Sequence, residues 1–143
     1  IQMEKGERIF AESDSMVSMQ DGIEIRGSLR GGFFSSLVRQ FTSSEDLFQQ
    51  TLIAHSDSVV MLAPAIPGDI RVLKVDYNKR YFLNDYAFFA GEDTISLETK
   101  MQKSIGSMIF DSDGIFILEA SGTGNLAING MGSIEEIELD ANS

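Results

Sequence analysis

The chain contains no cysteine and only one histidine among its 143 residues. Without cysteine, disulfides, thiolate nucleophiles and zinc sites built on sulfur are excluded. The lone histidine, His55, also excludes metal sites that need several imidazole ligands. A chain of this length fits one domain, or two small repeats that share a core, and it can bury most of its apolar surface without cross-links.

Positive charge is scarce and scattered. The chain has 11 Lys and Arg against 22 Asp and Glu, which gives a formal net charge of −11. The basic residues run from Lys5 to Lys103, and only Lys79 and Arg80 are neighbours in sequence. Because a polyanion would be repelled by such a surface, the composition argues against a general nucleic-acid binder.

Long hydrophobic runs are also missing. The longest apolar stretch, residues 59–66, is interrupted by Pro64 and is far shorter than the roughly 20 residues of a membrane-spanning helix. The sequence therefore predicts no integral membrane segment. Together with the acidic composition, which favours solubility, this leads us to expect a cytoplasmic protein.

What the chain does contain is a series of turn signals separated by segments of strand composition. Asp-Gly and Asn-containing pairs favour hairpins, because Gly and Asn tolerate the positive φ that the turn positions need. The chain is therefore predicted to be mainly β. The turns and the strands beside them are Asp21-Gly22 between 16–19 and 23–25, Pro67-Gly68 after 58–66, Asn78-Lys79 between 72–77 and 81–83, and Asp113-Gly114 between 108–110 and 115–117.

The spacing of apolar residues predicts how these strands are covered. Residues 23–26, and residues 134–139 from Glu136 onward, alternate apolar and charged side chains, which is typical of strands with one exposed face. Residues 59–63 and 115–118 are apolar on both faces, which is typical of strands between two layers.

One segment has helical periodicity. Phe33, Phe34, Leu37, Val38 and Phe41 recur at the spacing of one helix face and predict a single short helix. No linker, low-complexity tract or charge block divides the chain, so composition places no internal domain boundary.

Gly122, Gly124 and Ala127 spell the G-x-G-x-x-A pattern of a dinucleotide-binding turn. That pattern binds a pyrophosphate only where the turn leads into a helix whose amides meet the ligand. Residues 125–128 alternate like a strand and run into the hairpin pair Asn129-Gly130. We therefore predict two consecutive hairpin strands joined by a tight glycine turn.

His55, Ser56 and Asp57 are the residue types of a hydrolase triad, but they are adjacent in the sequence. Neighbouring side chains of an extended segment point to opposite faces and cannot hydrogen-bond in series. A structural role for His55 is therefore expected.

Asp111-Ser112-Asp113-Gly114 resembles the opening of a calcium-binding loop. Such a loop needs Gly at its sixth position and Glu at its twelfth, and this chain has Phe116 and Gly122 there. The segment is interpreted as a hairpin turn. We assign no catalytic, cofactor-binding or metal-ligating residue, and expect no cofactor.

Methionine is the remaining candidate for a binding surface, because its flexible side chain adapts to a partner. Core filling is the favoured role of the methionines. Met16 and Met19 flank a predicted exposed hairpin, so they mark the place where an adhesive surface would lie.

A series of short motifs occurs in a fixed order along nearly the whole chain. They are Gly6-Glu7, Ala11-Glu12, residues 15–19, Gly31-Gly32-Phe33-Phe34 with Arg39, Leu62-Ala63-Pro64, residues 67–70, Phe88-Phe89-Ala90-Gly91, residues 121–124 and Gly130. As an ordered set they resemble the mitochondrial biogenesis AIM-type family, a family of TRAP-like proteins.

The resemblance implies an all-β fold, a shortened TRAP-like double-stranded β-helix or β-sandwich in a single domain over residues 1–143, with the one short helix. It also implies two pseudo-repeats with a boundary near 67–80. Where many members carry Gly-Glu-Ser, this chain has Ser44-Glu45-Asp46, so a rebuilt turn is expected there. Members usually extend well past the strand expected to end at Leu139, so we expect a truncated second repeat.

The resemblance implies no known reaction, and closed rings such as trimers are expected. We therefore expect a non-catalytic homo-oligomeric β-scaffold, with a trimer favoured, that contacts a protein partner or membrane-organising machinery and no nucleic acid. One alternative is an RNA-binding ring like the tryptophan-regulated attenuator of the same fold, which would need basic and aromatic residues repeated along one edge. The other is a cupin-like enzyme with a metal held by Asp69, Asp111 or Asp113.

Overall fold

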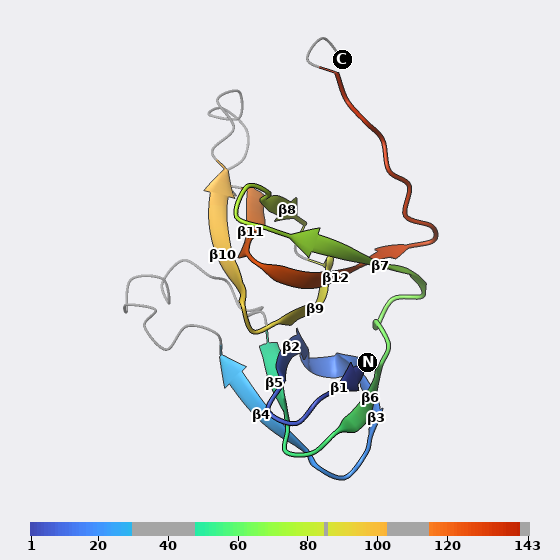
Figure 1. The fold of residues 1–143 in the computed structure, drawn as a ribbon. Coiled ribbons are helices and arrows are strands. Elements are labelled where there is room, and N and C mark those ends of the chain that lie inside the picture. The colour runs from blue at the N-terminus through green and yellow to red at the C-terminus, as the bar shows by residue number, and fades with distance from the viewer. Residues whose placement is uncertain (30–47, 85, 103–114, 141–143) are drawn as a thin grey trace.

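The computed structural model describes residues 1–29, 48–84, 86–102 and 115–140. The described part is built from strands and one short 3-10 helix, η1 (Ser13–Ser15), which confirms the all-β prediction (Figure 1). The helix expected over residues 33–41, the departure at 44–46 and the turn at 111–114 lie outside the described residues. The strands are β1 (Gln2–Met3), β2 (Arg8–Glu12), β3 (Met16–Met19), β4 (Ile23–Leu29), β5 (Phe48–Ala54), β6 (Ser58–Leu62), β7 (Gly68–Val75), β8 (Tyr81–Leu83), β9 (Phe88–Glu92), β10 (Ile95–Gln102), β11 (Ile115–Gly122) and β12 (Gly124–Met131).

These strands form one large and two small antiparallel sheets. The six-stranded sheet has the order β4-β5-β2-β9-β12-β7, and the three-stranded sheets have the orders β1-β6-β3 and β10-β11-β8. Each three-stranded sheet draws its strands from one half of the chain, and the two halves meet where β2 pairs with β9. The expected division into two pseudo-repeats near 67–80 stays a prediction.

Two hydrophobic cores fill the space between these sheets. The first lies between the β1-β6-β3 sheet and the strands around β2 and β5, and the second between the β10-β11-β8 sheet and the strands around β9 and β12. Buried residues of the first core are Met3, Ile9, Ala11, Ile23, Leu52, Ala54, Val60, Phe89 and Ala90. Those of the second are Val75, Leu83, Phe88, Ile95, Leu118, Ala120 and Leu126.

The expected turns after Asp21 and before Lys79 are present, but the strands beside them do not pair with each other as hairpins. Gly22 has φ 96° in the turn after Asp21, yet β3 pairs with β6 and β4 pairs with β5. The second turn is closed by a hydrogen bond of 3.0 Å from the Lys79 N–H to the Asp76 carbonyl. It joins β7 and β8, which belong to different sheets. Hairpin pairing at these turns was therefore a wrong prediction, because burial in a two-layer packing decided the partners and the local turn did not.

The glycine-rich stretch is a sheet connection, as predicted, and no helix follows it. Gly122 (φ 111°) and Gly124 (φ 148°) flank the point where the chain passes from β11 in one sheet to β12 in another. A Cβ on Gly122 would lie 2.3 Å from the Thr94 carbonyl oxygen, so both the backbone angle and the space require glycine. β11 and β12 do not form a hairpin, and Asn129-Gly130 lies inside β12 and forms no turn, which corrects that part of the prediction.

Two further predictions about strands were wrong. β6 is not covered on both faces, because Val59 and Met61 are 43% and 58% exposed while Val60 between them is buried. Residues 134–139 form no strand, since no described strand lies beside them to complete the backbone hydrogen bonds. For residues 115–118 the structure describes two side chains, with Ile117 half-buried and Leu118 buried.

Candidate functional site

The residues of the possible triad contact three different partners. They lie in the bend between β5 and β6. The Nε2 atom of His55 lies 2.7 Å from a Glu24 carboxylate oxygen, whereas the Ser56 hydroxyl lies 3.3 Å from the Ser58 hydroxyl. The Asp57 carboxylate accepts the backbone N–H of Lys5 over 2.9 Å. The three side chains are not in series, so this segment holds turns and strand ends in place.

His55 belongs to a small network on the surface of β4. Glu24 pairs with Arg26 two residues along the strand, with Nε and Oε1 2.5 Å apart, and with His55 on its other oxygen. These hydrogen bonds, that from Arg26 first and that from His55 second, lower the pKa of Glu24 to about 2. The network therefore fixes a carboxylate in its ionised form.

Asp69, the one described member of the possible carboxylate-metal set, accepts two backbone hydrogen bonds. Its Oδ1 accepts the N–H of Ile70 over 2.9 Å and its Oδ2 accepts the N–H of Ile134 over 3.4 Å. Asp111 and Asp113 lie outside the described residues. Within the described ranges, no three His, Asp or Glu side chains are grouped so that they could hold a metal ion.

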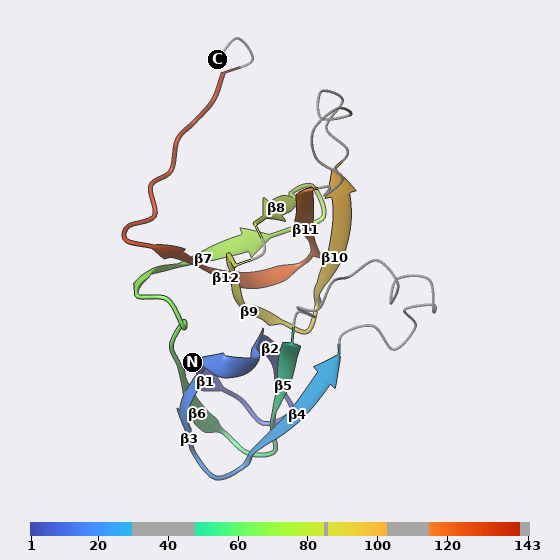
Figure 2. The same ribbon diagram turned by 180° about the vertical axis from the view of Figure 1, so that it is seen from behind.

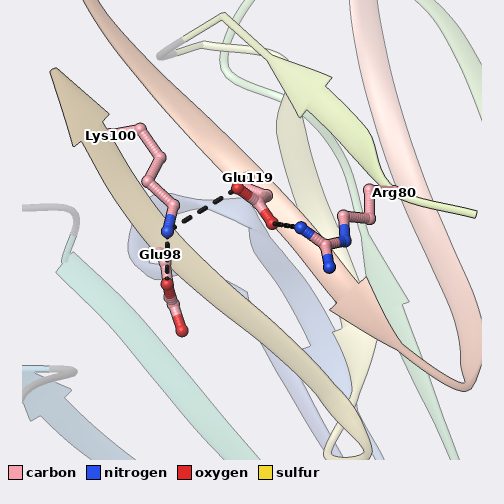
Figure 3. Close-up of polar contacts among 4 residues, drawn as sticks. All are labelled: Arg80, Glu98, Lys100 and Glu119. Atoms are coloured by element: carbon pink, nitrogen blue, oxygen red, sulfur yellow. Dashed lines mark hydrogen bonds and ion pairs between the residues drawn. The ribbon is translucent and has the colours of Figure 1, made fainter. Parts of the chain in front are cut away.

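The densest charge cluster of the described structure lies on the outer face of the β10-β11-β8 sheet (Figure 3). Glu98 of β10 and Glu119 of β11 are direct cross-strand partners, an arrangement that is unfavourable for like charges. Two cations offset it. The Nζ of Lys100 lies 2.9 Å from Glu98 and 3.7 Å from Glu119, and the guanidinium of Arg80 lies 3.3 Å from Glu119.

The ionisation of this cluster follows from its geometry. The hydrogen bond from Lys100 lowers the pKa of Glu98, and the same bond raises the pKa of Lys100. Glu98 and Lys100 are thus held in their charged forms, and a cation lies beside each carboxylate. The cluster places charge on this face of the molecule, beside the exposed side chain of Phe82.

The outer face of the other small sheet is apolar. We use the name β6 outer face for Val17, Val59 and Met61, which are all exposed. Val59 and Met61 alternate with buried residues and so point away from the first core, and Val17 lies in a bulge of β3 beside Met61. Of the two methionines that were candidates for an adhesive surface, Met19 is exposed, whereas Met16 packs against the first core.

A hollow lies beside the start of β7. Its volume is about 220 Å³, and Ile66, Tyr86, Asn129 and Met131 are among the residues that line it. Tyr86 and Met131 are largely exposed. The hollow is shallow and mostly apolar, and it lies next to the end of β12.

No helix in the described ranges is long and apolar enough to cross a membrane.

With the fold and these surfaces in view, comparison with known proteins gives a consistent result. The family model of mitochondrial biogenesis AIM24 matches residues 1–143. The chain belongs to this family. The resemblance inferred from the order of the sequence motifs is thereby confirmed.

The chain is similar to two proteins of Streptococcus pyogenes. One, an uncharacterised protein, is 31% identical over 147 residues, which is 98% of this chain and 58% of the relative. The other is known from a crystal structure, with a TM-score of 0.74 and 31% identity over 97% of this chain and 62% of that chain. This AIM24-family chain therefore spans about three fifths of the length of both relatives.

Proposed function

We propose that this AIM24-family chain is a non-catalytic β-scaffold that works through surface contacts, by associating with further copies of itself and by binding a protein partner. The β6 outer face supports this proposal most directly. It exposes three adjacent apolar side chains on a chain whose net charge is −11. Contiguous exposed apolar residues are a mark of interaction surfaces.

The contrast between the two small sheets strengthens this argument. They take comparable positions over the two cores. One outer face carries the Arg80, Glu98, Lys100 and Glu119 cluster beside the exposed Phe82, whereas the strands of the other small sheet contain no charged residue. If both outer faces only had to be exposed to water, charged side chains would be expected on both. The family connection with mitochondrial biogenesis makes membrane-organising machinery the class of partner that we propose, and the trimer expected from the resemblance is the assembly that we propose.

Native mass spectrometry and analytical ultracentrifugation over a wide concentration range test the proposal. We expect the wild-type chain to associate, and a Met61→Lys substitution to weaken the association about 10- to 100-fold, because burial of one large apolar side chain has that weight. Phe82→Lys, a matched change of an exposed residue on the outer face of the other small sheet, should leave association unchanged. A wild-type chain that is monomeric at every concentration would contradict self-association.

A further inference from the structure

β7 is an edge strand with an open side. It ends the six-stranded sheet, and β12 is its one strand partner among the described residues. The Ile70 N–H donates to the Asp69 carboxylate, and the N–H of Asn129, which lies opposite Ile70, donates to the Ala87 carbonyl over 2.9 Å. Ile70 and Asn129 are therefore a non-hydrogen-bonded pair of the antiparallel ladder.

Hydrogen-bonded and non-hydrogen-bonded pairs alternate along the ladder, so the direction of the Val72 backbone groups follows from that of Ile70. Two residues on, Val72 opposite Ala127 must also be a non-hydrogen-bonded pair, so the N–H and C=O of Val72 point away from β12. Side chains protect the two ends of this open edge. The Asp69 carboxylate accepts the N–H of Ile70, and the Tyr81 hydroxyl donates to the Lys74 carbonyl over 3.3 Å.

Arg71 is the one charged side chain in the middle of β7, and no described strand covers its open side. β7 runs for 8 residues in continuous register with β12, without a bulge and without proline. Val72 is 67% exposed. A long, regular and apolar edge is a template for pairing with another strand.

A segment suited to that edge leaves the body at the end of β12. We call residues 133–140 the C-terminal arm. It is extended, has no secondary structure and projects away from the sheets (Figures 1 and 2). Ile137 and Leu139 are 78% and 77% exposed and alternate with Glu136 and Glu138, which is the pattern of a strand that lacks a partner.

The charges of the arm and the edge are complementary. β7 presents the cations Arg71 and Lys74. The acidic residues of the arm are Glu135, Glu136, Glu138 and Asp140. One such contact already exists within the chain, since the Arg71 guanidinium lies 3.8 Å from the Glu136 carboxylate.

We propose that the C-terminal arm of one copy pairs as an added strand with the open edge of β7 in a second copy. The inference rests on the proposed self-association and adds a second contact between copies to the one proposed at the β6 outer face. The base of the arm touches its own β7 through Ile134 and Glu136. A second copy is nevertheless the favoured occupant, because the arm beyond its base extends away from its own sheet (Figure 2). Ile137 and Leu139 are exposed there. Backbone hydrogen bonds to Val72 supply affinity, and attraction between the acidic arm and the cations of β7 supplies specificity.

Two charge-reversed proteins test this pairing. The edge variant carries Arg71→Glu and Lys74→Glu, and the arm variant carries Glu136→Lys and Glu138→Lys. Each alone places like charges at the contact, so we expect each to associate at least about tenfold more weakly than wild type. An equimolar mixture restores opposite charges between unlike chains, so association should return, with both masses present in one complex by native mass spectrometry.

A second pair of variants keeps the test independent of charge and of folding. Val72→Pro removes the central N–H of the edge, which bonds to no β12 group, and should weaken association about tenfold while the thermal melting curve remains cooperative. Val72→Thr retains the N–H and the β-branched shape and is the matched control.

The outcomes separate the two proposals. The arm–edge pairing is wrong, and self-association stands, if wild type associates but the equimolar mixture does not. The same conclusion follows if neither the charge-reversed edge variant nor Val72→Pro weakens association. A single chain that carries all four reversals should also associate. If that chain stays monomeric while wild type associates, the arm occupies its own edge and the pairing between copies is wrong. If wild type is monomeric throughout, both proposals fail.

Discussion

Phe88 and Phe89 are neighbours in β9 and are equally buried, with 3% exposure each, yet they pack in different cores. Successive side chains of a strand point to opposite faces, so Phe88 enters the second core and Phe89 the first. A register irregularity between β9 and β12 allows Ala90 to follow Phe89 into the first core. This pair is the point at which the two halves of the fold are joined.

A double-mutant cycle tests that separation. Phe88→Leu and Phe89→Leu should each destabilise the fold, and their effects on the free energy of unfolding should add to within about 0.5 kcal/mol. Phe88→Leu combined with Ile95→Val, a change within the same core, should depart from additivity by about 0.5 kcal/mol or more. Urea denaturation measures all of these values, and strong coupling across β9 would show that the two cores act as one.

The Gly122 position should be intolerant of any side chain. Gly122→Ala combines a positive φ with a Cβ placed against the Thr94 carbonyl oxygen, so we expect a loss of more than about 2 kcal/mol in the free energy of unfolding. Gly6→Ala is the matched control, because Gly6 has φ 94° but open space around it, and its cost should be about 1 kcal/mol. Equal losses in the two variants would mean that the contact with Thr94 relaxes freely.

The charge cluster on β10 and β11 should depend on its shared lysine. Lys100→Met leaves Glu98 opposite Glu119 with Arg80 alone to offset them, so we expect a small loss of stability that shrinks at high salt. Adding Glu98→Gln to Lys100→Met removes the repulsion and should recover most of the loss. Thermal unfolding at low and high ionic strength measures both effects, and a loss that does not respond to salt would point to packing of the lysine stem.

The Glu24 network predicts a specific acid response. Its pKa in the folded protein is lowered from the usual 4.5 to about 2, so the stabilisation is fully present above pH 4.5 and is lost as the pH falls from about 4.5 to about 2. Carboxyl NMR titration of Glu24 should show the low pKa directly. Glu24→Gln should flatten the pH dependence of unfolding in that window, and an ordinary titration midpoint would mean that the contacts with Arg26 and His55 do not persist in solution.

The sequence by itself determined the fold class, the family and the chemistry that is absent. Strand composition and turn residues are local properties, so the turn after Asp21, the turn before Lys79 and the glycine connection at Gly122 could all be located from the chain alone. Composition excluded sulfur-based sites, because no arrangement of the chain can supply a missing side chain.

Only the tertiary structure decided which strands pair and which faces remain exposed. β10 carries a regular alternation around Ile95, Glu98 and Lys100 that could have marked it as a strand, but its partner β11 follows only after many residues. Likewise, the run around Val59 contains apolar residues for two faces, and nothing local indicates that one face meets solvent. Strand partners and layer contacts depend on residues far apart in sequence, so pairing, the charge cluster, the β6 outer face and the open edge of β7 emerge only when the chain is folded.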